Sequence, residues 1–232
     1  MALILHIDTA QEEATVALSE NDKVIEVLQN KDQRNHASFL QPAIQTIIQH
    51  STFNIQQLNA VSVIAGPGSY TGLRVGLASA KGLCYALSIP LITLNTLKIM
   101  AIAAINSSTH ELINPSTLFC SMIDARRDEV FTAMYDNKLN TILQPCAMIL
   151  NKESFMEIRK SHELVFFGSG ASKWNVICTN NNSIDMSMIN MVDAQVILAH
   201  TYFKNKIFAD IAYTEPFYIK DFYSPAQKNL DK

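Results

Sequence analysis

Apolar and polar positions divide the first half of the chain into short strands and amphipathic helices. Three apolar runs predict a meander of strands over residues 3–7, 14–19 and 23–29, with a turn at Asn21-Asp22. Further apolar runs and apolar residues at helical spacing continue the pattern. They predict helices at 36–50, 54–58, 73–87 and 97–105 and strands at 60–65 and 91–94. The main order, β-β-β-α-β-α-β-α, predicts an α/β fold.

The second half of the chain begins the same pattern again. Residues 118–124 predict a strand that ends in Asp124, as the first strand ends beside Asp8. Laying Asp124 on Asp8 aligns strand, polar turn, strand and Asn-containing turn without gaps. The repeat predicts two lobes of similar topology, one over 1–105 and a smaller, degenerate one over 106–232. Weaker signals predict a polar connection at 106–115, a helix at 155–161, a strand at 164–167, a loop at 180–183, a helix at 194–204 and an extended polar tail at 215–232.

A glycine-rich turn precedes the long helix of the first half. It has the sequence Gly66-Pro67-Gly68-Ser69-Tyr70-Thr71-Gly72, and Ser69 or Thr71 can cap the helix. One interpretation is a loop that holds a phosphate or another anion at the helix N-terminus. The other is a structural turn on a helix packed closely against a neighbour. The sequence matches neither the P-loop nor the dinucleotide-binding glycine pattern, so both interpretations stay open.

The helix after this turn carries small residues along two stripes. One stripe holds Gly72, Gly76, Ser79 and Leu83, and the other holds Ala78, Gly82 and Ala86. Glycine inside a helix costs about 1 kcal/mol relative to alanine. We therefore expect another helix to approach closely. The sequence leaves open whether that helix belongs to the same chain or to a partner.

Composition narrows the class of protein. A net charge of −3 with 17% charged residues argues against a broad basic face for nucleic acid, and the longest basic run is Arg126-Arg127. Four scattered cysteines predict buried thiols in a reducing compartment. The N-terminus lacks a signal-peptide pattern, and no apolar run reaches the length of a membrane span. We expect a cytoplasmic protein that does not contact a membrane.

Candidate chemistry gathers where the two repeated strands end. Asp8-Thr9 could hold a hydrated metal or a phosphate, although an Asp that caps a turn is favoured. Arg126, close to Asp124, could bind an anion, although an ion pair with Asp128 or Glu129 is favoured. Each of these residues therefore has a structural interpretation beside the functional one.

The remaining candidates are weaker. Gly168 and Gly170 could approach a nucleotide or form a plain β-turn. We expect His6 in the core or at a sheet edge, and His36 at a helix start near the surface. The histidines lack zinc-site spacing, and no residue stands in a nucleophile elbow. The sequence predicts no catalytic residue, no metal site and no cofactor.

Six segments together resemble the TsaB (YeaZ) family, in order along nearly the whole chain. They are residues 7–9, 36–44, 66–76, 123–126, 168–171 and 216–220. The resemblance implies the fold of the actin-like ATPase superfamily (ASKHA), with two ribonuclease-H-like lobes. This fold agrees with the internal repeat.

The resemblance separates the chain from the paralogous TsaD proteins, which are catalytic. TsaD-like proteins carry a metal-binding H-x-x-x-H after the strand that follows the glycine helix, and this chain has Thr96 and Met100 at those places. Neither is a plausible ligand for a catalytic iron or zinc. The phosphate-binding glycines of the superfamily are also missing after Asp8. Independent ATP hydrolysis is therefore not expected.

The resemblance implies a non-catalytic scaffold for tRNA modification. TsaB-like proteins act with a TsaD-like catalytic subunit and a TsaE-like ATPase in transferring a threonylcarbamoyl group to the adenosine beside the anticodon. It further implies a homodimer, a shared surface for TsaD, and tRNA binding only within the complex. The alternative function is an autonomous small ATPase or kinase of the actin-like superfamily.

The implied site residues form two sets. The partner and dimer interface is expected at Phe39, Leu40, Ala43, Ile47, Thr71, Gly72, Arg74, Val75, Gly76, Ser79, Gly82, Leu83 and Ala86. A vestigial nucleotide or anion site is expected at Asp8, Thr9, Asp124, Arg126, Gly168 and Gly170.

Overall fold

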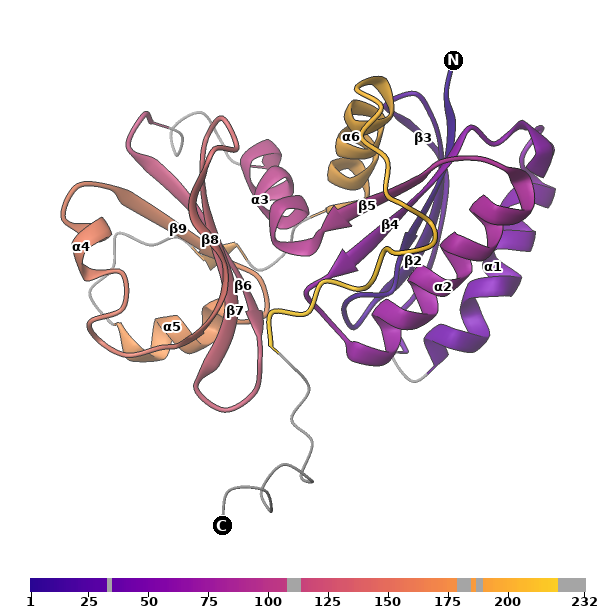
Figure 1. The fold of residues 1–232 in the computed structure, drawn as a ribbon. Coiled ribbons are helices and arrows are strands. Elements are labelled where there is room, and N and C mark those ends of the chain that lie inside the picture. Colours follow the sequence, from indigo (N-terminus) through magenta and orange to yellow (C-terminus); the bar gives the residue numbers. More distant parts are fainter. Residues whose placement is uncertain (33–34, 108–113, 179–184, 187–189, 221–232) are drawn as a thin grey trace, which may run out of the picture.

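The chain forms two lobes, each built on a five-stranded mixed sheet (Figure 1). The computed structural model describes residues 1–32, 35–107, 114–178, 185–186 and 190–220. The first sheet has the order β3-β2-β1-β4-β5. Its strands are β1 (Leu3–Asp8), β2 (Ala14–Glu20), β3 (Lys23–Asn30), β4 (Ala60–Gly66) and β5 (Leu91–Asn95). The first three strands are antiparallel, and β4 and β5 run parallel to β1.

The second sheet repeats this plan, with the order β10-β9-β6-β7-β8. Its strands are β6 (Thr117–Asp124), β7 (Glu129–Asp136), β8 (Thr141–Ile149), β9 (Glu163–Phe167) and β10 (Asp185–Met186). Again the central strand pairs antiparallel with the next strand and parallel with a later one. Asp8 and Asp124 each end the central strand of a sheet, which confirms the repeat predicted from the sequence.

Helices complete a layered arrangement (Figure 1). On the outer face of the first sheet lie α1 (His36–His50) and α2 (Tyr70–Leu87), and η2 (Ile55–Gln57) precedes β4. Between the two sheets lie α3 (Thr96–Ser107) and α6 (Met191–Lys204), and α4 (Met156–Arg159) and α5 (Ala171–Ile177) belong to the second lobe. Alternation along β1 explains the layers, because Leu5 packs with α1 and α2 while Ile4 packs with α6. Within the described residues, every helix is too short or too polar to cross a membrane.

The lobes exchange helices across the predicted boundary at residues 105–106. Helix α3 directly follows β5 of the first lobe, but its Leu97, Met100 and Ala104 pack against the second sheet. Helix α6 follows the second lobe, but its Ala194 and Leu198 pack against the first sheet. A division by sequence position therefore separates α6 from the sheet that it covers. Helix α3 belongs to both lobes, because its Ile99 and Ile102 pack with the first.

Several other predictions are corrected or completed by the structure. Strand β8 and helix α5 were not predicted, since Pro145 interrupts the strand pattern and α5 is only 7 residues long. β8 is an edge strand, where proline is tolerated. His36 starts α1 as expected, but it is buried and its Nε2 lies 3.0 Å from the Glu12 carbonyl. The predicted loop at 180–183 and most of the connection at 106–115 lie outside the described residues.

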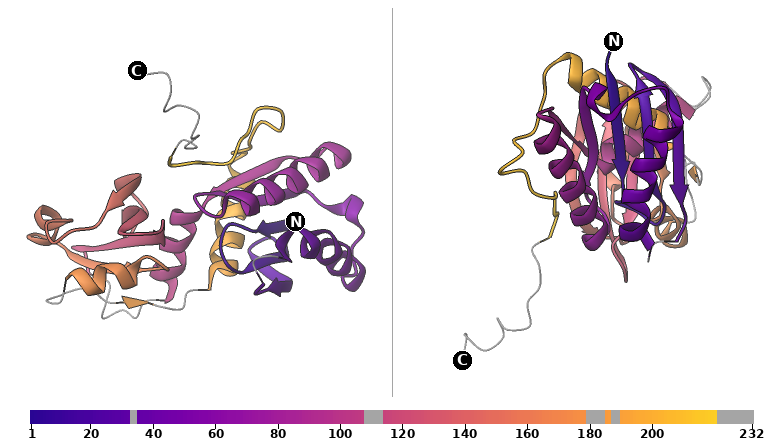
Figure 2. Two further views of the ribbon diagram at one scale, coloured as in Figure 1. Left: turned by 90° about the horizontal axis from the view of Figure 1, so that it is seen from below. Right: turned by 90° about the vertical axis from the view of Figure 1, so that its right-hand side faces the viewer.

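A segment that we call the C-terminal strap, residues 207–220, returns from α6 along α2 (Figures 1 and 2). Ala209 bridges to Leu91 at the start of β5. Lys81 Nζ donates to the carbonyls of Ala212 and Thr214. The strap contains the first part of the predicted tail at 215–232, and residues 221–232 lie outside the described part of the chain.

Candidate functional site

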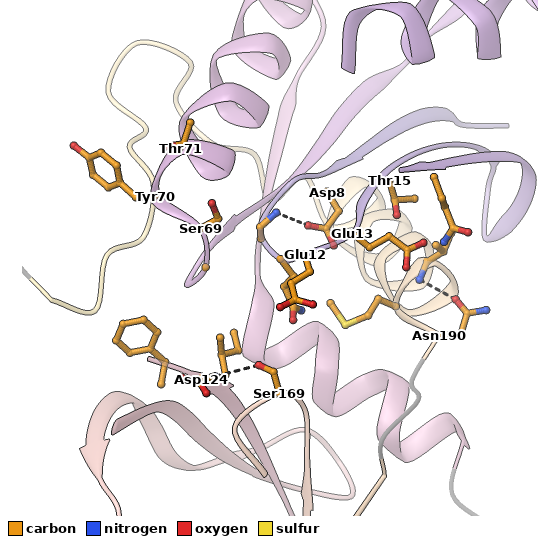
Figure 3. A pocket seen from close by; sticks show the side chains of 18 of the residues that line it. Asp8, Glu12, Glu13, Thr15, Ser69, Tyr70, Thr71, Asp124, Ser169 and Asn190 are labelled. Atoms are coloured by element: carbon orange, nitrogen blue, oxygen red, sulfur yellow. Dashed lines mark hydrogen bonds between the residues drawn. The ribbon is translucent and has the colours of Figure 1, made fainter. Parts of the chain in front are cut away.

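A cleft of about 1490 Å³ lies between the lobes, where β1 and β6 end and α2 begins (Figure 3). Among the described residues that line it are five carboxylates and one cation, Arg126. The carboxylates are Asp8, Glu12, Glu13, Asp124 and Asp193. A cleft walled by one sign of charge repels ligands of the same sign. Its charge therefore opposes binding of a phosphate chain.

Asp8 is the most buried of these carboxylates. Its Oδ1 accepts a hydrogen bond of 2.8 Å from the Ala10 N–H, so it caps the turn as the sequence favoured. The pKa of Asp8 is raised to about 6, chiefly by burial and in smaller part by the charge of Glu13, against the lowering effect of the Ala10 hydrogen bond. Asp8 is therefore largely ionised at pH 7.5, inside a buried environment that disfavours its charge.

Asp124, at the matching place in the second lobe, is half exposed and paired. Lys173 Nζ lies 2.7 Å from its Oδ1, and the Arg126 N–H donates to the same oxygen at 2.6 Å. The Lys173 hydrogen bond lowers the pKa of Asp124. The predicted pairing of Arg126 with Asp128 or Glu129 is wrong for Glu129, which pairs with Lys220 instead.

Three residues of the predicted anion site pack against other parts of the chain and do not line the cleft. Thr9 is buried, and its hydroxyl donates to the Gly72 carbonyl at 2.7 Å. Gly168 has a φ of +95°, and a side chain there would strike the Met122 carbonyl. Gly170 packs against Ile123 and Val130 in the same way. The structure thus brings only Asp8, Asp124 and Arg126 of the predicted set to the cleft.

Two N–H groups of the glycine turn, those of Ser69 and Gly72, have partners within the chain. Ser69 caps α2 by accepting from the Gly72 N–H, while its own N–H donates to the Ala10 carbonyl at 2.7 Å. A Cβ atom on Gly68 would collide with that same carbonyl. Because these N–H groups already have partners, the structural interpretation of the turn is the one that the geometry favours.

The cleft does not fit ATP, the nucleotide that the fold superfamily suggests. The turn after Asp8 presents Glu12 and Glu13 instead of glycines, so charge repulsion meets a phosphate where backbone donors would be needed. Thr96 and Met100, at the places of the TsaD-like histidines, are buried, and the Met100 methyl group lies against Gly168. Within the described ranges, no group of three or more His, Cys, Asp and Glu side chains could hold a metal ion.

The predicted interface divides into buried and accessible residues. The buried ones are Leu40, Ala43, Ile47, Gly72 and Gly76, which belong to the interior of the first lobe. These five residues therefore do not form an accessible surface, which corrects their place in the predicted interface. Phe39, Val75, Ser79 and Leu83 are half-buried, and Thr71, Arg74, Gly82 and Ala86 are exposed.

The glycines of α2 explain this division. A side chain on Gly72 or Gly76 would collide with Thr9, so the close neighbour that these glycines admit is the chain's own β1–β2 turn. Gly82 has no atom within 4 Å of the place where a Cβ would be. Of the glycines in α2, Gly82 alone leaves room for another molecule.

The accessible face of α2 is a row that we call the α2 stripe. It consists of Thr71, Arg74, Ala78, Gly82, Tyr85 and Ala86. Their spacing of three or four residues places them on one side of the helix, between α1 and the C-terminal strap. Tyr85, which is 81% exposed, was missed by the sequence analysis. Its position three residues after Gly82 was the available signal.

Solved structures define the class of protein. Two Pseudomonas aeruginosa structures share the fold, one titled YeaZ and the other described by its similarity to the peptidase YeaZ. Their TM-scores are 0.76 and 0.78, at 21% and 20% identity, over 94% and 95% of this chain and the whole of theirs. The chain therefore has the two-lobe α/β fold of these structures.

Sequence comparisons narrow the class to a family. The family model for TsaD, tRNA N6-adenosine threonylcarbamoyltransferase, matches residues 23–218. The tRNA threonylcarbamoyladenosine biosynthesis protein TsaB of Escherichia coli is 34% identical over 175 residues, which are 74% of this chain and 73% of that protein. Its Bacillus subtilis counterpart is 34% identical over 58% of this chain and 56% of that protein. The chain belongs to the TsaB (YeaZ) family.

Proposed function

We propose that this chain is a non-catalytic subunit in the synthesis of threonylcarbamoyladenosine in tRNA. It acts by binding a TsaD-like catalytic subunit, in an assembly that also contains a TsaE-like ATPase. The relatives named for this biosynthesis support the pathway. The observation that carries the non-catalytic role is the chemistry of the cleft, where carboxylates replace the phosphate-binding turn and Thr96 and Met100 replace the metal-binding histidines.

The α2 stripe and the adjacent α1 side chains are the proposed binding surface, for a second copy of this chain and for the TsaD-like subunit. Ala78 and Gly82 allow a partner helix to come close, and half-buried Phe39, Val75 and Leu83 supply apolar area at its border. The Gln41 amide donates to Ser79 Oγ at 3.0 Å, which ties α1 to α2 as one face. Because both partners use this face, the homodimer competes with the heterodimer.

Reconstitution tests the proposal. The purified chain, its TsaD partner, the TsaE ATPase and the threonylcarbamoyl donor are combined with tRNA, and each protein is left out in turn. We expect modification only when this chain and TsaD are both present. Turnover of ATP or modification of tRNA by this chain alone, abolished by Asp8→Ala, would instead support the autonomous ATPase.

A further inference from the structure

The end of the C-terminal strap is bonded to both lobes. On the first lobe, the Phe217 N–H donates to the Ala65 carbonyl at 2.7 Å, and the Phe217 carbonyl lies against Gly66. On the second lobe, Lys220 Nζ lies 2.6 Å from a carboxylate oxygen of Glu129, at the start of β7. Three residues further along the strap from its bond to the first lobe, the chain is therefore bonded to the second lobe.

The side chains between these two bonds reach the proposed binding surface. Arg74 Nε donates to the Tyr218 hydroxyl at 3.0 Å, and the Arg74 guanidinium lies 4.0 Å from the centre of the Tyr70 ring. The Tyr70 and Tyr218 rings are 5.5 Å apart. Ile219 packs with the core of the second lobe, beside α3. Arg74 is thus held in one orientation on the α2 stripe by a segment whose other end lies on the second lobe.

We propose that residues 217–220 are an interlobe latch that also orients Arg74 for the protein partner. The inference rests on the proposed function for the identity of the partner, but the latch itself is a property of the isolated chain. A guanidinium held by an aromatic ring and a hydroxyl has already lost side-chain entropy, so a partner carboxylate or carbonyl binds it at lower cost. A movement of the second lobe would therefore pull on residues 217–220 and change the orientation of Arg74 on the α2 stripe.

Two substitutions and a control test the latch. Lys220→Ala removes the bond to the second lobe, and Lys152→Ala is the matched control, an exposed lysine of the same lobe outside the strap. Tyr218→Phe removes the hydroxyl that Arg74 uses and keeps the ring. Hydrogen–deuterium exchange of the strap peptide is measured in the isolated chain, and affinity for purified TsaD is measured by calorimetry.

For Lys220→Ala we expect about two- to fivefold faster exchange of the Phe217 and Tyr218 amides, the size of effect typical of one exposed ion pair. We expect a loss of TsaD affinity of similar size for Lys220→Ala and for Tyr218→Phe, and neither effect for Lys152→Ala. Unchanged exchange in Lys220→Ala overturns the latch. Faster exchange with unchanged affinity overturns its coupling to the partner surface. If the wild-type chain fails to bind TsaD, the proposed function fails, and the exchange data still decide the latch.

Discussion

Neutralising Asp8 should stabilise this protein at neutral pH. Asp8 is buried, and its pKa is raised from 3.8 to about 6 by the loss of hydration. Each unit of pKa shift is equivalent to 1.36 kcal/mol, so ionised Asp8 lowers the free energy of unfolding by about 3 kcal/mol. In Asp8→Asn the amide oxygen can still accept the hydrogen bond from Ala10, which Asp8 Oδ1 now accepts. We therefore expect the variant to be more stable by about 2–3 kcal/mol at pH 7.5.

The pH dependence gives this prediction its sign. Between pH 3.8 and about 6 the folded chain holds a proton on Asp8 that the unfolded chain has lost, so stability from this group falls as pH rises through that window. Near pH 4 Asp8 is protonated in the folded chain and about half protonated in the unfolded chain, so the advantage of Asp8→Asn should shrink to about 0.5 kcal/mol. The two free energies of unfolding are obtained from urea titrations at pH 4 and pH 7.5.

Glu12→Gln is the control, because Glu12 is an exposed carboxylate of the same cleft. If general repulsion among the cleft carboxylates were the cause, the control would be stabilised about as much as Asp8→Asn. An Asp8→Asn variant that is less stable than the wild type at pH 7.5, or equally altered at both pH values, would refute the burial argument.

Three further outcomes are expected. Gly82→Leu should shift the light-scattering mass to that of a monomer without loss of stability, whereas Gly76→Leu should destabilise the chain by several kcal/mol because the new side chain meets Thr9. Filter binding should show weak tRNA binding by the isolated chain with a shallow salt dependence, and tight, steeply salt-dependent binding would contradict the scaffold role. His6 forms hydrogen bonds with two serine hydroxyls, and burial lowers its pKa to about 3. Its contribution to the free energy of unfolding is therefore present above pH 6.5 and is lost as pH falls toward 3. His6→Ala should therefore cost about 2–4 kcal/mol at pH 7 and less at pH 4, in the same urea assay.

Much of the fold could be predicted, because local pattern determines it. Strands and helices of the first lobe follow from apolar spacing, and Ser69 was a recognisable helix cap. The repeat of Asp8 in Asp124 indicated the two similar sheets. These features depend on neighbours within a few residues or on a comparison of the chain with itself.

The errors came from contacts between distant residues. Gly72 and Gly76 have the spacing of a helix–helix contact, but the atom that requires their small size belongs to Thr9, about sixty residues earlier in the chain. Lys220 is the ion-pair partner of Glu129, which the sequence offered with Asp128 as an alternative partner of Arg126. The spacing of residues along a helix shows which of them share a face, but it does not show which part of the protein packs against that face.

The exchange of α3 and α6 between the lobes has a consequence for the order in which the chain folds during synthesis. The inner face of the first sheet carries Ile4 and Ile64, and the apolar residues of α6 that cover it appear only near the end of translation. Until then the first half of the ribosome-bound chain exposes an apolar sheet face to water. Exposed apolar surface makes a partly folded chain prone to aggregation. We expect a fragment that ends before residue 191 to need a chaperone, and a separately added α6 peptide to restore its solubility.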